Sequence, residues 1–233
     1  MSFRAFALFT LLAIGQASPA PKVLGYDDVV VMREDGAVVM KKWEYQIQED
    51  KRDVQKRKAQ VARAASSSQL ATRGCEESTE VQVLSDTKFD NWDVAMSPVI
   101  KNTGAGASVA VTKGYSISDS IQVSESVSAS VEDFLTTTMS ISVTDTWTTQ
   151  DSQTFTFSVP AGEYGVVISN PLTRRVSGNV LSGCTDDPTT TAFSSDSYTS
   201  QTYGDLSWVT GVISICNSTT YPIPYCVGDG THE

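Results

Sequence analysis

The residue types that most often carry chemistry are scarce in this chain of 233 residues, which has four cysteines and one histidine. Residues 1–17 resemble a secretory signal peptide, and an even number of cysteines in a secreted chain predicts disulfides rather than catalytic thiols. None of the four has the Cys-x-x-Cys spacing of a zinc site, so we expect two disulfides and no bound metal. The spacing leaves all three pairings open. The four residues are Cys75, Cys184, Cys216 and Cys226.

A catalytic centre is not expected. The histidine is His232, near the end of the sequence given, where a frayed backbone positions an imidazole poorly for a Ser-His-Asp or Cys-His site. Glycine-rich phosphate loops, Gly-x-Ser-x-Gly and His-Glu-x-x-His are absent from the sequence. We therefore predict no catalytic residues and no cofactor. Two carboxylates distant in sequence could still form a glycosidase, so a carbohydrate-active enzyme is kept as the last of three function classes.

The strongest side-chain pattern lies between Ala107 and Val159. Apolar residues fall almost entirely on the odd positions there, and serine or threonine fills nearly every even position. Because side chains alternate faces along a strand, this predicts strands with one apolar face and one hydroxyl face. Tyr115–Val131 and Thr138–Thr148 would be unusually long strands. With a turn near residues 132–137, they would form one long hairpin.

Two interpretations of this hairpin compete. In a soluble sandwich the apolar face packs inside and the hydroxyl face meets water, and alternation serves soluble sheets more often. In the other, the hairpin enters a membrane as part of an oligomeric β-barrel, because a spanning strand needs about 9–11 residues, apolar outward and polar inward. The candidate membrane-facing residues are Ile121, Val123, Val127, Val131, Met139, Ile141, Val143 and Trp147.

Two acids, Glu125 and Asp145, interrupt the apolar face. A turn centred on residue 135 would set Glu125 opposite Asp145, and Asp119 opposite Asp151. Like charges opposed across strands are destabilising, and burying such a pair raises the pKa of at least one carboxyl group. We therefore expect membrane activity to increase at acidic pH. The simpler alternative is that these acids lie at a kink or bulge, or face water.

Charge and composition divide the chain into three parts. Residues 1–17 have a basic start, a short apolar run and small residues before the expected cleavage point, as in a secretory signal peptide. Residues 18–74, with a net charge of about +3, predict a leader with a hairpin around Gly36 and a helix from Lys41 to Ala65. Residues 75–233, with a net charge of about −14, predict an acidic all-β mature domain.

The leader contains basic sites at which late-secretory endoproteases could cut. They end in Arg52, Arg57 and Arg73. We predict a propeptide that is removed at one of them, the alternative being a solvated helix face. Asn217 begins an Asn-Ser-Thr glycosylation acceptor directly after Cys216.

The fold class expected is all-β: an elongated antiparallel sandwich or twisted sheet with one long hairpin, preceded by the small hairpin-plus-helix leader. The acidic body argues against nucleic acid as a partner.

Two resemblances to known families rest on particular residues. The alternating block from Tyr115 to Gly165, which ends in a Ser-Val-Pro-Ala-Gly turn, resembles the Ser/Thr-rich region of aerolysin-type β-pore-forming proteins. That likeness covers about residues 95–180. Over nearly its full length the chain is similar to a group of small secreted fungal proteins described as effector-like. The segments that carry this second resemblance are Lys22–Asp28, Asn91–Pro98, Ser169–Arg175, Gly204–Trp208 and Tyr221–Gly228.

These resemblances imply a non-enzymatic, extracellular protein that acts on another organism or on a cell surface, with a membrane as partner after oligomerisation. The chain departs from the larger pore-forming proteins in having no obvious separate receptor-binding domain, so the host or cell-surface target is not indicated. The alternative class is a secreted β-sandwich that binds a cell-wall glycan or a protein without membrane activity.

Overall fold

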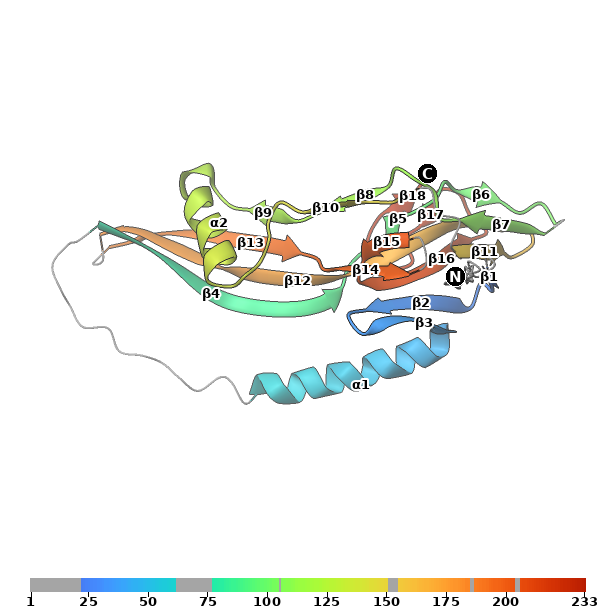
Figure 1. The fold of residues 1–233 in the computed structure, drawn as a ribbon, viewed down its shortest axis with the longest axis horizontal. Helices are drawn as coiled ribbons and strands as arrows, with labels where there is room; N and C mark the ends of the chain where they lie inside the picture. The colour runs from blue at the N-terminus through green and yellow to red at the C-terminus, as the bar shows by residue number, and fades with distance from the viewer. Residues whose placement is uncertain (1–21, 62–76, 105, 151–154, 185–186, 204–205) are drawn as a thin grey trace, which may run out of the picture.

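The computed structural model describes residues 22–61, 77–104, 106–150, 155–184, 187–203 and 206–233, the side chains of residues 22, 53–61 and 77 excepted. The molecule is elongated, and strands run along its long axis from one end to the other (Figure 1). A compact body lies at one end, and a narrower extension of long strands lies at the other. The two parts share one continuous strand.

That strand is β12 (Tyr164–Cys184), which is 21 residues long. Its first part pairs antiparallel with β16 (Gly211–Ser218) in the body. Its second part pairs with β4 (Glu77–Asp90) on one side and β13 (Thr189–Ser197) on the other. We call β4, β13 and the second part of β12 the long sheet. A register shift after Ser177 lets β4 pass close to Gly178, where an added Cβ would lie 1.9 Å from the carbonyl oxygen of Gln82.

Short strands complete the body. β2 (Asp28–Arg33) and β3 (Gly36–Lys41) extend the sheet beyond β16 in the order β3-β2-β16-β12-β13-β9. β11 (Phe155–Val159) lies between β1 (Lys22–Leu24) and β7 (Ala107–Ala110). The remaining strands of the body are β5 (Val94–Ala95) and β6 (Ile100–Lys101), which pair with β12, and the pairs β14 (Ser200–Tyr203) with β15 (Leu206–Val209) and β17 (Ile223–Pro224) with β18 (Thr231–His232).

The main core of the body is apolar and aromatic. Phe157 and Trp208 are fully buried in it, together with Met32 and Ile213. The one polar atom of the tryptophan ring is satisfied, because Trp208 Nε1 donates to Ser169 Oγ at 3.0 Å. A buried N–H without such a partner would cost stability.

The predicted hairpin and helix of the leader are both present, as β2, β3 and α1 (Lys42–Val61). The hairpin belongs to the body: β2 pairs with β16, and Val30 and Met32 have no exposed surface. Helix α1 is held mainly by polar contacts near its start, where Lys42 Nζ donates to the Ile215 carbonyl at 3.0 Å and the Tyr45 hydroxyl donates to Asp90. Removal of residues 18–74 by proteolysis stays a prediction, but it would take two strands out of the sheet.

The all-β fold class is confirmed, with strands in several antiparallel sheets and little helix. The region expected to form two long strands differs in detail. Among residues 115–149 only β8 (Ser116–Ser118), β9 (Ser120–Gln122) and β10 (Thr146–Thr148) are strands. The predicted turn at residues 132–137 instead lies inside helix α2 (Ser128–Thr137), which follows a short 3-10 turn at Glu125–Val127. No helix among the described residues has the length and apolar composition needed to cross a membrane.

Candidate functional site

Residues 115–149, which we call the packed segment, leave the body and return to it across one face of the long sheet (Figure 1). Its base is closed by two backbone hydrogen bonds, from Thr149 N–H to the Tyr115 carbonyl at 2.8 Å and from Gly114 N–H to the Thr149 carbonyl at 3.0 Å. Next to the base, β8 and β10 pair over three positions. Farther out, β9 pairs with β13 over three positions and α2 lies across the sheet.

The packed segment is held to the long sheet by an apolar cluster. Val131 and Leu135 of α2 have no exposed surface and pack with Val176, Val180 and Phe193 of the long sheet. Seven of the eight residues predicted to face a membrane belong to this cluster: Ile121, Val123, Val127, Val131, Met139, Ile141 and Val143. The eighth, Trp147, packs against the main core of the body, with its ring 6.0 Å from that of Tyr198.

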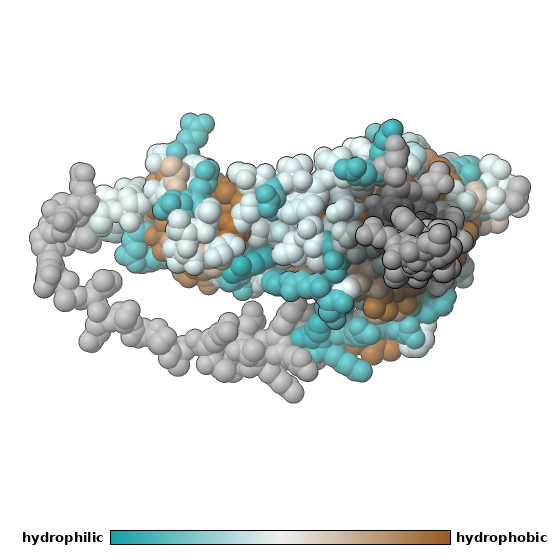
Figure 2. All heavy atoms as spheres, in the orientation of Figure 1, coloured by the Kyte–Doolittle hydropathy of each residue, from teal (hydrophilic) through white to brown (hydrophobic). Residues whose placement is uncertain are grey.

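Burial in the packed segment keeps the odd–even pattern of the sequence although most of the segment is not strand. The odd-numbered apolar residues are buried or half-buried with the exception of Ala129, and the even-numbered serines and threonines are exposed with the exception of Ser128. Figure 2 shows the result: pale, moderately polar side chains cover much of this face, and brown apolar side chains gather beside α2. The periodicity therefore identified the buried face correctly but not the backbone conformation.

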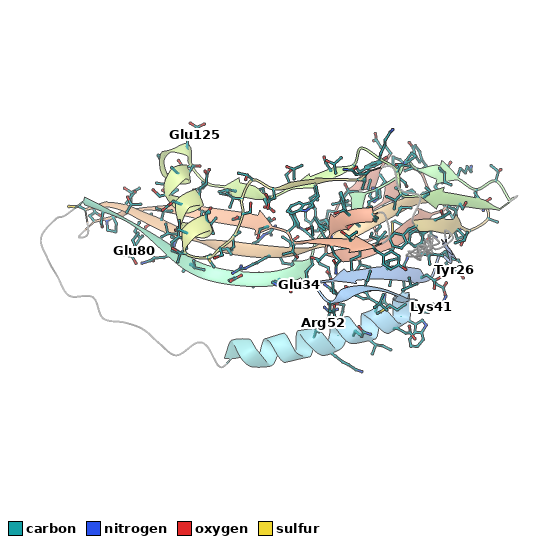
Figure 3. The ribbon with its side chains drawn as sticks, viewed as in Figure 1. Tyr26, Glu34, Lys41, Arg52, Glu80 and Glu125 are labelled. Atoms are coloured by element: carbon teal, nitrogen blue, oxygen red, sulfur yellow. A yellow bond between two sulfur atoms is a disulfide. The ribbon has the colours of Figure 1, made fainter. Side chains whose placement is uncertain are left out.

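The two acids expected to oppose each other are apart. β8 and β10 pair with Ser118 opposite Thr146, a register that differs from the expected one. Glu125 and Asp145 are both exposed, and Glu125 points away from the sheet beside α2 (Figure 3). The helical path of residues 125–137 replaces the strand that the Glu125–Asp145 pairing needed.

The buried acid is Asp119, between β8 and β9. Its backbone N–H donates to the Asp145 carbonyl at 2.9 Å, and its Oδ1 accepts from Tyr198 N–H at 3.0 Å, while Oδ2 has no hydrogen-bond partner among the described residues. Burial, with a smaller contribution from the Asp145 carboxylate, raises the pKa of Asp119 to about 6, although the Tyr198 hydrogen bond opposes this. Asp119 thus holds the packed segment to Tyr198, directly after β13, through a carboxyl group whose ionisation is unfavourable there.

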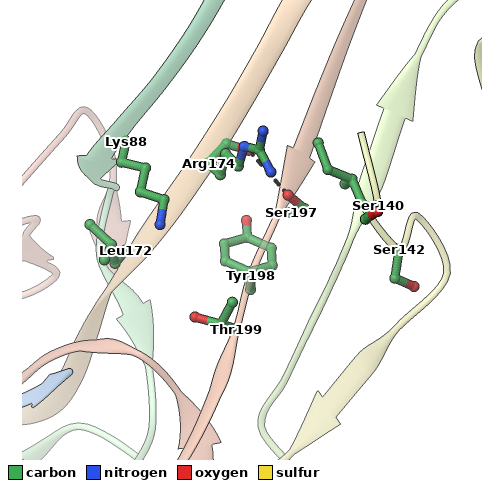
Figure 4. Close-up of a pocket in the computed structure, with 9 residues that line it drawn as sticks. Lys88, Ser140, Ser142, Leu172, Arg174, Ser197, Tyr198 and Thr199 are labelled. Carbon is green, nitrogen blue, oxygen red and sulfur yellow. Dashed lines mark hydrogen bonds between the residues drawn. The ribbon is translucent and has the colours of Figure 1, made fainter. Parts of the chain in front are cut away.

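A small cavity remains between the returning part of the packed segment and the sheet (Figure 4). Its volume is about 130 Å³, and its walls include Ser140, Ser142, Arg174 and Tyr198. Ser140 has a φ of 52°, a left-handed conformation that is uncommon outside glycine. The cavity marks a place where the segment fits the sheet incompletely, because protein interiors are normally close-packed.

A second site, which the sequence did not indicate, surrounds Asp93 in the body. The Asp93 carboxylate is fully buried and accepts from Asn170 Nδ2 at 2.8 Å, Cys226 N–H at 2.7 Å and Val227 N–H at 3.1 Å. Its Oδ2 also lies 3.2 Å from His232 Nε2. The expectation that His232 is frayed is wrong: it pairs with Ile223 in the β17–β18 ladder and is only 5% exposed. A lone aspartate after Trp92 gave no sequence signal.

The other predicted residues lie at separate places. Cys216 and Cys226 form a disulfide, and Cys184 is also disulfide-bonded. Asn217 Nδ2 donates to a Glu163 carboxylate, so attaching a glycan at that nitrogen requires the hydrogen bond to open. Arg52 pairs with Glu49 on α1. The predictions for residues 1–17, Cys75, Arg73 and Asp151, and for the side chain of Arg57, lie outside the described residues.

Comparison of the chain with protein-family models, with curated proteins and with solved structures found no match.

Proposed function

We propose that this protein is a non-enzymatic secreted protein whose packed segment leaves the long sheet and enters a target membrane as a β-hairpin, together with the segments of other copies. The observation that carries the proposal is a conflict between pattern and conformation in residues 115–149. The side chains alternate as in a long strand, yet the structure places much of the segment in helix α2 and in irregular backbone. Such conflicts between local preference and fold are expected at functional sites.

In the released form, the alternating residues of the segment could form the long strands that they do not form in the packed structure. Ile121–Val131 and Met139–Trp147 have the length of membrane-spanning strands, which is about 9–11 residues. The residues now buried against Val176, Val180 and Phe193 would face lipid, and the exposed serines and threonines would face water. The same apolar face would thus be buried against the long sheet in the packed state and against lipid in the inserted state. This supports a segment that moves from the sheet to the membrane rather than one that stays on the sheet.

Few backbone hydrogen bonds oppose the release. The segment pairs with the rest of the sheet through only the three positions of β9, whereas β4 pairs with β12 over thirteen. The apolar cluster therefore contributes most of the interaction that holds the packed segment on the long sheet. Lipid chains can replace these contacts because they are as apolar as the buried side chains.

A reversible tether tests the proposal. Gln122 and Ser194 are directly paired between β9 and β13, and opposed residues in antiparallel strands have the Cα separation that a disulfide requires, about 4.5–5.5 Å. Gln122→Cys with Ser194→Cys should abolish dye release from liposomes while oxidised and restore it on reduction. The matched control is Asn179→Cys with Ala192→Cys, a pair between β12 and β13 that does not involve the packed segment. It should release dye in both states.

The outcomes separate the function classes. Equal dye release by the oxidised tether and the control would contradict membrane insertion of this segment. A wild-type protein that never releases dye but binds cell-wall glycans on an array would support the binding module instead.

A further inference from the structure

The residues around Asp93 form a compact group of ligand-type side chains in the body, where β16, β17 and β18 lie, away from α2 (Figure 1). Asp93, Cys216 and His232 are all buried, and one ligand atom from each lies within 4.8 Å of the other two. Cys216 Sγ is bonded to Cys226, whose backbone N–H already contacts Asp93 Oδ2. Three ligand-type side chains therefore meet at one point, and the exposed Cys226 adds a second sulfur bonded to that of Cys216.

We propose that reduction of the Cys216–Cys226 disulfide converts this group into a Zn²⁺ site with Cys216, Cys226, His232 and Asp93 as ligands. A disulfide sulfur is not a thiolate, so the site exists only in the reduced protein. A dithiol supplies the two electrons and two protons: its own sulfurs become a disulfide, and the protein S–S bond becomes two thiols. The two thiol protons are released when Zn²⁺ binds the thiolates.

The chemistry and spacing of the four ligands favour zinc. Two thiolates, one imidazole and one carboxylate match its tetrahedral preference, whereas Mg²⁺ and Ca²⁺ prefer oxygen ligands alone. Ordinary zinc–ligand distances of 2.0–2.3 Å place neighbouring ligand atoms roughly 3.3–3.8 Å apart. The separation between Asp93 Oδ2 and His232 Nε2 is already 3.2 Å. These two atoms need only small shifts around a metal ion, whereas the Cys226 sulfur must turn towards them once its bond to Cys216 is broken.

Surrounding contacts would orient the ligands. Asn170 Nδ2 and Val227 N–H both donate to Oδ1 of Asp93, which leaves Oδ2 directed at His232. The His232 ring is fixed by the β17–β18 ladder and by the Tyr225 ring, whose centroid lies 4.4 Å away. Contacts of this kind tune metal affinity. Zinc would then connect β16 to the segment that follows it in the reduced protein, as the disulfide does in the oxidised one.

The test is a titration of the full chain with Zn²⁺. The protein is reduced with dithiothreitol, freed of it under argon, and titrated against a chromophoric chelator. Reduced wild type should bind Zn²⁺ at least about tenfold more tightly than reduced His232→Gln, while oxidised wild type should show no such site. Glutamine keeps a donor for Asp93, and Asp229→Asn, which changes an exposed acid nearby, should bind like wild type.

Two further measurements test whether the bound zinc occupies the proposed site. Cys216→Ser with Cys226→Ser reports zinc held by other thiols, such as Cys184, and its binding is subtracted. Co²⁺ in reduced wild type should give the intense spectrum of a tetrahedral thiolate site, which decides the matter even if His232→Gln folds poorly. Equal affinity of wild type and His232→Gln, zinc binding fully retained by the double serine variant, or a weak octahedral Co²⁺ spectrum would each overturn the proposal. The liposome assay reports independently on the packed segment.

Discussion

The packed segment has 35 residues and β12 has 21; burial alternates along the packed segment and along much of the second part of β12, but only β12 is a continuous strand. β12 is flanked by β16 in the body and by β4 and β13 in the long sheet, so hydrogen bonds to neighbouring strands are available over its whole length. The packed segment lies over the face of the long sheet instead of extending its edge for more than the three positions of β9. Alternation thus predicts which side chains are buried, while a strand also needs a partner backbone.

The largest expected effect is in the body. Phe157 is fully buried in the main core, so Phe157→Ala should lower the free energy of unfolding by about 3–5 kcal/mol. The loss should be global, because β11 lies between β1 and β7. Urea denaturation monitored by circular dichroism measures it, with Thr156→Ala on the other face of β11 as the control. A loss below about 1 kcal/mol in the free energy of unfolding would show that the core of the body is not tightly packed around Phe157.

The packed segment should respond locally to a similar change. Leu135 is fully buried under α2, so Leu135→Ala should weaken its packing on the long sheet by about 2–3 kcal/mol. Amide hydrogen exchange should accelerate in residues 128–137 more than in β12, because a locally held segment opens without global unfolding. Thr136→Ala changes an exposed neighbour and serves as the control. Uniform acceleration over both regions would contradict an independently opening segment.

A smaller effect is expected from pH, which should change the stability of the packed segment on the long sheet. The pKa of Asp119 is raised by burial to about 6, so the packed segment binds this proton more strongly than the released one does. The Asp119 contribution therefore favours packing at acidic pH and is lost as the pH rises through about 4 to 6. This direction is opposite to that expected for the sequence-predicted Glu125–Asp145 pair. Release of the segment should become easier towards neutral pH.

Hydrogen-exchange protection of residues 128–137, corrected for intrinsic exchange, measures this dependence. Protection should fall between pH 4 and pH 7 in wild type, and Asp119→Asn should flatten the profile. Asp133→Asn alters an exposed acid on α2 and is the matched control. A slope that persists in Asp119→Asn would assign the effect to another group.

The smallest effect is expected at a partly exposed ion pair on the long sheet. Arg174 donates through Nε and Nη2 to the two carboxylate oxygens of Asp86, which lowers the pKa of Asp86 through these hydrogen bonds. Both side chains are partly exposed, so Asp86→Asn should cost less than about 1 kcal/mol in urea denaturation. A larger cost would mean that this pair, rather than the apolar cluster, holds the long sheet together.

Much of this architecture was determined by the sequence. Alternation in residues 107–159, the hairpin signal around Gly36 and the leader composition predicted an all-β domain preceded by a hairpin and a helix. The odd-numbered apolar residues, Val131 and Ile141 among them, were correctly identified as one coherent face. These properties are local, since they follow from side-chain periodicity and backbone preference along a few successive residues.

Tertiary structure alone decided where those elements go. Residues 128–137 form a helix because burying Val131 and Leu135 against Val180 and Phe193 outweighs their strand pattern, and no sequence window contains both sets of residues. Asp93 and His232 are 139 positions apart, and their contact depends on the path of β16 and the segment that follows it. Which residues meet across such separations depends on the packing of the whole chain, and this is not encoded in any short stretch of sequence.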